Sequence, residues 1–180
     1  MNVLPTELPG VLIVEPKVHG DARGFFFEAY HQQRYADAGI PGPFVQDNVS
    51  RSARGILRGL HYQQPRAQGK LMSALAGRIW DVAVDVRRGS ATFGKWVGVE
   101  LSEDNRRQLW VPPGFAHGFC VLSDSADVAY KCTDFYSPEH EHTILWNDPQ
   151  LAIPWPVEQP KLSPKDLAGK ALADSALPEL

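Results

Sequence analysis

The stretch Ile79-Trp80-Asp81-Val82-Ala83-Val84-Asp85-Val86 is the most regular segment of this chain and decides its fold class. Large apolar residues alternate along it with Asp81, Ala83 and Asp85, and successive side chains of a β-strand point to opposite faces. The pattern therefore predicts a strand over residues 78–86 with one apolar face. The opposite face carries the two aspartates, which are either solvated outward positions or polar groups of a site.

Similar short runs, separated by turns rich in glycine and proline, flank this strand on both sides. They predict strands over 11–14, 25–28, 44–50, 55–63, 70–76, 95–101, 108–111, 118–122 and 126–133. Many short strands at this spacing predict a mainly β protein, built as a sandwich or a jelly-roll barrel.

The remaining segments predict little helix. Residues 19–24 are interpreted as a turn, and residues 30–38 as a short helix that ends at Gly39, because glycine commonly follows the last residue of a helix. The C-terminal part is rich in proline, and we expect it to be ordered up to residues 166–167, where a short helix is predicted. Residues 171–180 are expected to be loose.

Composition limits the classes of function. The 180 residues are 43% hydrophobic and 22% charged, and their length predicts a single domain over 1–180. A net charge of -3 provides no basic field for nucleic acid, although Arg51, Arg54 and Arg58 could bind a small anion locally. Without a recognisable signal peptide or an apolar stretch of bilayer length, we expect a soluble, cytoplasmic protein with no membrane partner. Cys120 and Cys132 are predicted to be buried free thiols.

Two histidines lie in runs that otherwise consist of strand, apolar and turn residues. His61 stands in Arg58-Gly59-Leu60-His61-Tyr62-Gln63, and His117 stands in Trp110-Val111-Pro112-Pro113-Gly114-Phe115-Ala116-His117-Gly118-Phe119. A lone histidine in a strand is more often structural than catalytic. Because strict alternation puts Arg58 and His61 on opposite faces, both can line one cavity only if the strand bulges, and Gly59 would permit that.

The histidine pattern argues against a metal site. A metal-binding barrel of this kind usually supplies a His-x-His pair from one strand, whereas Gln63 stands two residues after His61. His140 and His142 have the required spacing, but the polar segment 138–142 around them is interpreted as an exposed turn. We therefore predict that the protein binds no metal.

Lys70 and Tyr130 complete the set of candidate reactive groups. Lys70 opens a strand, where it either lines a cavity or extends its ammonium group into solvent. Tyr130 shares its face with Val128 and Cys132, which predicts an interior position. The chain has no Gly-x-Ser-x-Gly motif and no glycine-rich phosphate loop. Histidine, tyrosine and lysine around a barrel cavity, without metal or cofactor, suit proton abstraction next to a carbonyl group.

The segment 111–119 resembles the second cupin box, a Pro-x-Gly-x-x-His turn. The first cupin box, which supplies the metal-binding histidines, is replaced by Leu57-Arg58-Gly59-Leu60-His61-Tyr62-Gln63, and this replacement is typical of the dTDP-4-dehydrorhamnose 3,5-epimerase family. Further segments that resemble this family lie in order between residues 11 and 167, namely 20–26, 44–50, 81–87, 130–133, 144–149 and 162–166.

The resemblance implies a cupin-type double-stranded β-helix (a jelly-roll barrel) and a cofactor-free isomerase. Such an enzyme inverts C3 and C5 of a dTDP-linked 4-keto-6-deoxyhexose on the route to dTDP-L-rhamnose. By position, His61 would be the general base, and Asp166 would orient it by binding Nδ1 of the imidazole ring. Tyr130 would deliver a proton to the opposite face of the sugar, and Lys70 would stabilise the enolate oxygen on C4.

The same resemblance implies substrate contacts and an assembly. A homodimer that exchanges N-terminal strands is implied, so that Arg23 and Glu28 would reach the neighbouring site. Tyr136 and the phenylalanines at 25–27 are candidates for packing the thymine, and arginines suit the pyrophosphate. The implied substrate-binding residues are Arg23, Glu28, Gln46, Asn48, Arg58, Lys70, His117, Tyr136, Glu141 and Lys165.

Two alternatives remain open. One is a relative with different chemistry, such as a mono-epimerase of another dTDP-4-keto-6-deoxysugar or a 3,4-ketoisomerase. Tyr130 disfavours the ketoisomerase, which moves protons on one face of the sugar and needs no opposing acid. The other alternative is a non-catalytic cupin that binds a nucleotide sugar. Against it stands the joint presence of His61, Asp166, Lys70 and Tyr130, since a binding module could lose any of them.

Overall fold

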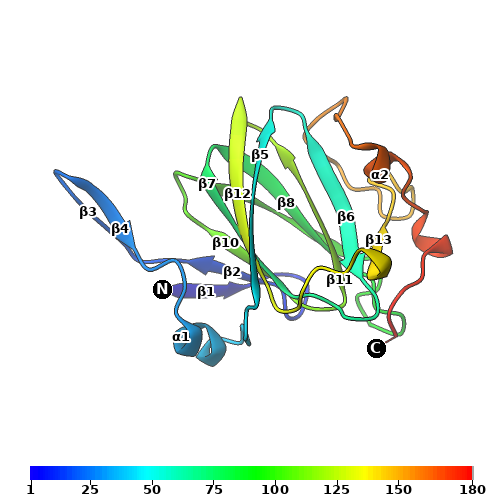
Figure 1. Cartoon of the computed structure of the whole chain (residues 1–180), viewed down its shortest axis with the longest axis horizontal. Coiled ribbons are helices and arrows are strands. Elements are labelled where there is room, and N and C mark those ends of the chain that lie inside the picture. Colours follow the sequence, from blue (N-terminus) through cyan, green and yellow to red (C-terminus); the bar gives the residue numbers. More distant parts are fainter. Residues whose placement is uncertain (180) are drawn as a thin grey trace.

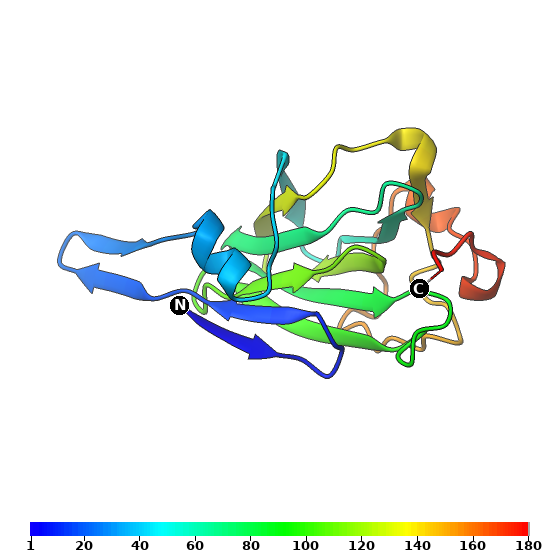
Figure 2. The same ribbon diagram turned by 90° about the horizontal axis from the view of Figure 1, so that it is seen from below.

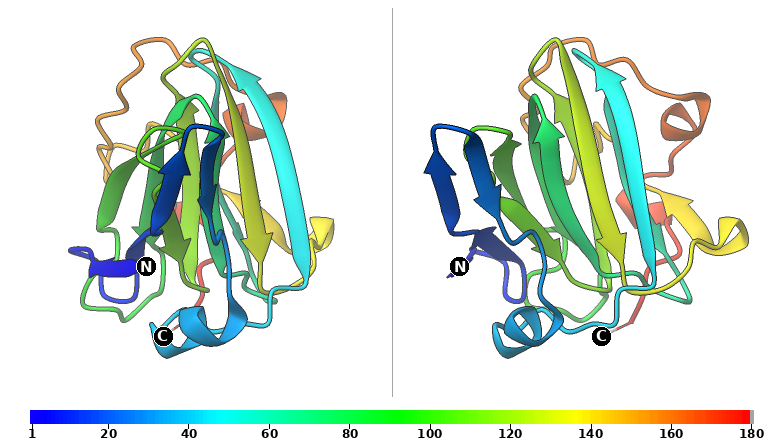
Figure 3. Two further views of the ribbon diagram at one scale, coloured as in Figure 1. Left: turned by 90° about the vertical axis from the view of Figure 1, so that its left-hand side faces the viewer. Right: turned by 60° about the vertical axis from the view of Figure 1, so that its left-hand side comes forward.

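The computed structural model describes residues 1–179, in which two antiparallel sheets face each other around a common interior (Figure 1). The six-stranded sheet runs in the order β1 (Asn2–Pro5), β2 (Leu12–Glu15), β10 (Gln108–Val111), β7 (Lys70–Ala76), β12 (Ser125–Cys132) and β5 (Gln46–Ala53). The five-stranded sheet runs in the order β13 (Glu141–Thr143), β6 (Leu57–Gln63), β11 (Phe115–Val121), β8 (Arg78–Asp85) and β9 (Trp96–Ser102). In Figure 3, β5, β12 and β7 lie side by side along the first of these sheets.

Helix is scarce, as the sequence predicts. The α-helices are α1 (Gln32–Asp37) and α2 (Pro164–Leu167), and the 3-10 helices are η1 (Pro138–His140) and η2 (Leu172–Asp174). The predicted helix over 30–38 is confirmed in a shorter form, with Gly39 just after it at φ +87. None of the helices within residues 1–179 has the length and hydrophobicity that crossing a bilayer requires.

Strand β8 explains why the alternating aspartates are not at the surface. Its apolar face, with Val82 and Val84, packs against Leu172 and other residues of the C-terminal segment on the outside of the barrel. The other face points into the interior, where Ala83 belongs to the cluster shared by both sheets. Asp81 and Asp85 are 0% exposed, so the interpretation of outward, solvated aspartates is wrong. Alternation separates two faces but does not say which one the rest of the chain covers.

The C-terminal segment is packed rather than loose, which corrects the prediction for residues 171–179. Leu172 is fully buried and its amide donates to the Asp148 carboxylate at 2.8 Å. The Tyr62 hydroxyl donates to the carbonyl oxygen of Ala176 at 2.9 Å. Burial of the Leu172 side chain contributes roughly 1.5–3 kcal/mol toward holding this segment against the barrel. Residue 180 lies outside the described residues.

A two-stranded hairpin projects from the barrel near the N-terminus (Figures 1 and 2). It consists of β3 (Val18–Asp21) and β4 (Gly24–Phe27), so of the turn predicted over 19–24 only residues 22–23 form the turn. Phe26 of β4 is 70% exposed, and Phe25 is covered on one side by the Arg106 guanidinium, 3.5 Å from the ring centroid. Strands β1 and β13 were not predicted either, and the strand predicted over 118–122 begins earlier, at Phe115.

Strand β6 carries the bulge that its sequence predicts. The register between β6 and β11 shifts between His117 and Phe119, and Gly59 adopts φ +128. A Cβ atom at Gly59 would lie 2.6 Å from Cα of Gly118, so only glycine fits this close approach of the two strands. The bulge turns the side chains of Arg58 and His61 toward the same cavity.

Candidate active site

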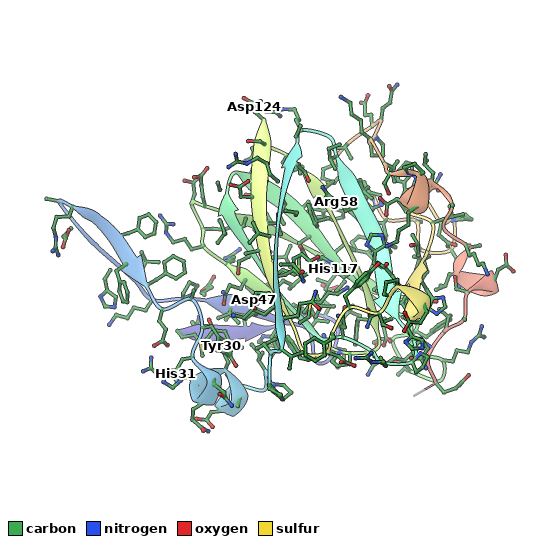
Figure 4. All side chains as sticks on the ribbon, viewed as in Figure 1. Tyr30, His31, Asp47, Arg58, His117 and Asp124 are labelled. Carbon is green, nitrogen blue, oxygen red and sulfur yellow. The ribbon has the colours of Figure 1, made fainter. Side chains whose placement is uncertain are left out.

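A cavity of about 330 Å³ opens at one end of the barrel, with strands of both sheets in its walls. Most of the predicted site residues line it, and His117 can be followed in the barrel interior in Figure 4. The predicted residues in its lining are Gln46, Asn48, Arg58, His61, Lys70, His117, Tyr130, Tyr136, Glu141 and Lys165.

His61 is held by Asp166, which approaches from α2. Nε2 of the imidazole lies 2.6 Å from Oδ1 of Asp166, and the carboxylate is almost fully buried. Asp166 itself is fixed by hydrogen bonds from the Ser163 hydroxyl at 2.7 Å and from the amide of Gly59 at 3.2 Å. Burial raises the pKa of Asp166, but the bonds from His61 and Ser163 outweigh this effect and lower it to about 2. Asp166 is therefore an anion at neutral pH.

The bonded nitrogen differs from the one expected. The family resemblance implied a bond from the aspartate to Nδ1 of His61, whereas the structure places the aspartate on Nε2. The Asp166 carboxylate lies beside the backbone of Gly59, and in that position its Oδ1 atom contacts Nε2 of the ring. Nδ1 is then the atom left to take a proton. Burial lowers the pKa of His61 more than Asp166 raises it, so the ring is neutral at neutral pH and can accept a proton.

A second histidine–aspartate pair lies beside the first. His117 is the cross-strand partner of His61, and its Nε2 lies 2.9 Å from Oδ1 of Asp81. The Asp81 side chain is fully buried, and its second oxygen, Oδ2, has no hydrogen-bond partner among residues 1–179. Burial raises the pKa of Asp81, which the nearby His117 and Lys70 offset only in part.

Lys70 and Tyr130 face the histidines from the six-stranded sheet. Lys70 lines the cavity at the start of β7, so its alternative interpretation as a side chain extended into solvent is wrong. Burial lowers the pKa of the Lys70 ammonium, although Cys132 and Glu141 act in the opposite direction. Burial also raises the pKa of the Tyr130 hydroxyl, which therefore keeps its proton at neutral pH.

Polar side chains at the mouth are joined to one another. The Tyr136 hydroxyl donates to Oε2 of Glu141 at 2.6 Å, and Glu141 also forms an ion pair with Lys165. The Tyr136 amide donates to the Gln46 side chain at 2.8 Å, and Gln46 donates in turn to Asn48 at 3.0 Å. This network fixes the Tyr136 ring at the entrance, where it is 48% exposed.

The expected arginine cluster is not formed. Arg51 pairs with Asp127 and Arg54 with Asp124, and these guanidinium groups are largely exposed. Of the three arginines only Arg58 lines the cavity, where its Nε donates to the Ser52 hydroxyl at 3.0 Å. The carboxylates of Asp127 and Asp124 thus engage these two guanidinium groups separately.

Arg23 and Glu28 do not line the cavity of this chain. Arg23 lies on the turn of the projecting hairpin and pairs with Asp21, and Glu28 pairs with Arg34 of α1. Their role as substrate contacts stays a prediction, because it requires a second copy of the chain.

The cavity is also lined by residues that were not predicted from the sequence. Alternation could have found most of them, because each stands two positions beyond a selected residue on the same strand. Gln68 comes from a loop and carries no such signal. These additional lining residues are Ser50, Gln68, Met72, Phe119 and Cys132.

His140 and His142 do not line the cavity, and of the two thiols only Cys132 does. His140 and His142 are half-buried rather than exposed, and the His142 ring stacks on Tyr62 at 5.2 Å. Within residues 1–179 no three histidine, cysteine, aspartate or glutamate side chains converge as metal ligands would. Cys120 and Cys132 are buried free thiols, as predicted.

Comparison with known proteins gives a consistent result. A family model described as dTDP-4-dehydrorhamnose 3,5-epimerase matches residues 5–174. The chain is 61% identical over 177 residues to the dTDP-4-dehydrorhamnose 3,5-epimerase of Pseudomonas aeruginosa, covering 97% of this chain and 98% of that protein. To the protein of the same name from Mycobacterium tuberculosis it is 41% identical over 179 residues, covering 97% of this chain and 89% of that protein.

Solved structures share the fold over almost the whole chain. The epimerase from Legionella pneumophila in complex with dTDP-4-keto-L-rhamnose matches with a TM-score of 0.97 and 58% identity, over 99% of this chain and 98% of that one. A 3'-monoepimerase from Streptomyces bikiniensis in complex with dTDP-quinovose matches with a TM-score of 0.92 and 36% identity, over 97% of this chain and 92% of that one. The chain therefore belongs to the dTDP-4-dehydrorhamnose 3,5-epimerase family.

Proposed function

We propose that this chain is a single-domain dTDP-4-dehydrorhamnose 3,5-epimerase that converts dTDP-4-dehydro-6-deoxy-D-glucose to dTDP-4-dehydro-L-rhamnose with its own side chains and no cofactor. One observation carries the proposal for the site. The base candidate His61 stands on β6 of the five-stranded sheet, and the acid candidate Tyr130 stands on β12 of the opposite sheet. A sugar ring bound between the sheets would meet a base on one face and an acid on the other, which is what inversion requires.

In the proposed reaction, Nδ1 of His61 removes the proton from C3 or C5. The electron pair of the broken C–H bond forms a C=C bond to C4, and the C4 carbonyl becomes an enolate. The Lys70 ammonium stabilises the charge on the C4 oxygen. The Tyr130 hydroxyl then gives its proton to the carbon from the other face and restores the ketone. Exchange with water returns a proton to Tyr130 and removes the one on His61.

The remaining lining residues are proposed to hold the nucleotide. The forked guanidinium of Arg58 suits the pyrophosphate, and the exposed ring of Tyr136 at the mouth suits stacking on thymine. Gln46, Asn48 and Glu141 supply hydrogen-bonding groups beside them. His117 and Lys165 are also proposed to contact the substrate.

We also propose a homodimer in which each hairpin β3–β4 reaches the neighbouring cavity. The hairpin exposes Phe25 and Phe26, at 58% and 70%, and carries Arg23 away from its own site. Large exposed aromatic residues on a projecting hairpin favour burial against a partner. A cytoplasmic location is proposed as well, since free thiols such as these two persist in a reducing compartment.

The function is tested by proton NMR of the enzyme with dTDP-4-dehydro-6-deoxy-D-glucose in deuterated water, with a reductase and NADPH added to trap the product. Deuterium at both C3 and C5, with a rhamnose product, supports the double epimerase. Deuterium and inversion at one carbon would identify a mono-epimerase. Binding of the nucleotide sugar without any exchange would leave a non-catalytic cupin and overturn the mechanism.

A further inference from the structure

Two histidines that line the cavity are each paired with a buried aspartate through the same atoms. His61 and His117 are cross-strand partners, and each uses Nε2 to bind the Oδ1 atom of a buried aspartate, Asp166 at 2.6 Å and Asp81 at 2.9 Å. The mechanism above uses only the first pair as a base. The second pair has the same groups in the same arrangement, so what distinguishes the two is the surroundings of the carboxyl groups.

Those surroundings differ. Asp166 accepts three hydrogen bonds besides the one from His61, namely from the Ser163 hydroxyl, the Ser163 amide and the Gly59 amide. Asp81 has His117 as its one partner, and its Oδ2 is buried without a donor among residues 1–179. Hydrogen bonds from several donors stabilise a carboxylate anion, whereas burial without donors favours the protonated acid.

The number of protons held by each histidine–aspartate pair determines whether Nδ1 of the histidine is a hydrogen-bond donor or an acceptor. With an anionic Asp166, Nε2 of His61 carries the hydrogen, and Nδ1 is a bare lone pair that can act as a base. If Asp81 carries a proton, its O–H donates to Nε2 of His117, and the ring hydrogen then resides on Nδ1. If that proton instead moves to Nε2, the ring becomes an imidazolium, and Nδ1 still carries a hydrogen. In either position of the shared proton, His117 presents an N–H donor.

We propose that the Asp81–His117 pair holds one proton more than the His61–Asp166 pair, and that Asp81 is a positioning residue that makes His117 an Nδ1–H donor to the substrate oxygen on which negative charge develops. The proposal rests on the epimerase function proposed above. It assigns opposite roles to two similar pairs: His61 accepts a proton, and His117 donates a hydrogen bond beside Lys70.

The direction of the pKa shifts agrees with this division. Burial raises the pKa of Asp81, while hydrogen bonds hold that of Asp166 at about 2. The charged groups that act on Asp81 are His117 from β11 and Lys70 from β7, and both favour its anion without overcoming burial.

The proton positions are measurable without substrate. Long-range proton–nitrogen correlation NMR of the ¹⁵N-labelled protein reports which ring nitrogen carries a hydrogen, with signals assigned through His61→Asn and His117→Asn. At neutral pH we expect hydrogen on Nε2 of His61 and on Nδ1 of His117. Hydrogen on Nε2 alone in both rings would overturn the proposal. Because no turnover is involved, this result stands apart from any failure of the epimerase function.

Matched amide variants provide the second test. In Asp81→Asn the amide N–H can donate to Nε2 as the carboxylic acid does, so His117 keeps its Nδ1–H, and we expect kcat to fall less than about tenfold. In Asp166→Asn the same donation moves the hydrogen of His61 onto Nδ1 and removes the base, so kcat should fall by at least about 100-fold.

Asp81→Leu, which has no polar group, should lower kcat by roughly 100-fold or more, as loss of a donor to an oxyanion does. Equal losses in folded Asp81→Asn and Asp166→Asn would contradict the proposal, because they would show that both aspartates act as anions. Substrate KM and thermal unfolding of each variant separate this loss from a general disturbance of the cavity.

Discussion

Nε2 of His61 lies 2.6 Å from Oδ1 of Asp166, although 105 residues separate the two in the sequence. The contact joins β6 to α2, and the capping box of α2 at Ser163 holds the same carboxylate. It also fixes the chemistry of the ring, because a nitrogen that donates to an anion leaves the other nitrogen as the proton acceptor.

Replacing His61 by asparagine should abolish exchange of solvent deuterium at C3 and C5, with a loss of at least about 100-fold, while nucleotide binding persists. His31→Asn is the matched control, since His31 caps α1 outside the cavity and asparagine also serves as an N-cap. NMR in deuterated water measures the exchange. Wild-type exchange in His61→Asn would show that another residue is the base.

The same assignment sets the pH dependence of kcat/KM. The base must be neutral, so activity rises with pH through the pKa of His61, and burial places that pKa below its usual 6.5. Lys70 must be charged, so activity falls again at a pH below the usual Lys pKa of 10.5. An acid limb above pH 6.5 would contradict the assignment.

Tyr130→Phe should separate the two halves of the reaction. His61 can still remove and return a proton on its own face, so exchange at C3 and C5 is expected to survive in part. Net inversion should fail, because no acid remains on the opposite sheet. Product analysis by NMR measures both, and full epimerase activity in this variant would refute the role of Tyr130 as the acid.

The sequence predicted most of the strands and most of the residues that line the cavity, but not β1, β3 or β13 and not all of the contacts made by distant segments. Alternation showed that a bulge, which Gly59 permits, is needed if Arg58 and His61 line one cavity, and the resemblance to the family placed Asp166 near His61. The pattern of β8 could not say that Asp81 points inward, because that depends on the C-terminal segment packing on the opposite face. The sequence also does not show which ring nitrogen of His61 bonds to Asp166, because that depends on where α2 lies relative to β6.

Gly59→Ala should destabilise the protein more than backbone strain alone explains. Gly24 has a similar φ of +133 but open space around it, whereas a Cβ at Gly59 would lie 2.6 Å from Gly118 and 2.8 Å from the His117 carbonyl oxygen. Strain at such a φ costs about 1–3 kcal/mol, which Gly24→Ala should show by itself. Urea unfolding of both variants measures the difference. Equal losses of stability in the two variants would mean that β6 and β11 can move apart at little cost in free energy.

Asp85→Asn should cost about 2 kcal/mol of stability at neutral pH. Burial raises the pKa of Asp85, but bonds from Arg87, Ser90 and Thr92 outweigh it and lower it to about 2 from 3.8. A depressed pKa stabilises the fold above about pH 3.8, and the contribution is lost as the pH falls through 2. The gap between variant and wild type in urea unfolding should therefore shrink toward pH 2.

Asp127→Asn, which breaks an exposed pair with Arg51, is the control for Asp85→Asn and is expected to change stability little. A loss that stays constant between pH 7 and pH 2 would show that the Asp85 charge does not stabilise the fold.

The proposed exchange of hairpins predicts complementation between two defective subunits. Arg23→Ala should weaken substrate binding and His61→Asn should remove the base, so each homodimer is impaired. In a mixed dimer, the site of the Arg23→Ala subunit combines its own intact His61 with the intact Arg23 of its partner. Mixed dimers isolated through two different tags should therefore recover one working site, measured as kcat/KM at low substrate concentration.

The control for this experiment is a mixed dimer of a Lys70→Met subunit with a His61→Asn subunit. Both residues lie in the body of the barrel, so every site of that mixed dimer lacks one of them and no recovery is expected. Recovery with Arg23→Ala but not with Lys70→Met therefore requires that Arg23 act in the neighbouring subunit. If neither mixture recovers, or if light scattering shows a monomer that is fully active, Arg23 does not serve a partner's cavity, and the exposed Phe25 and Phe26 need another explanation.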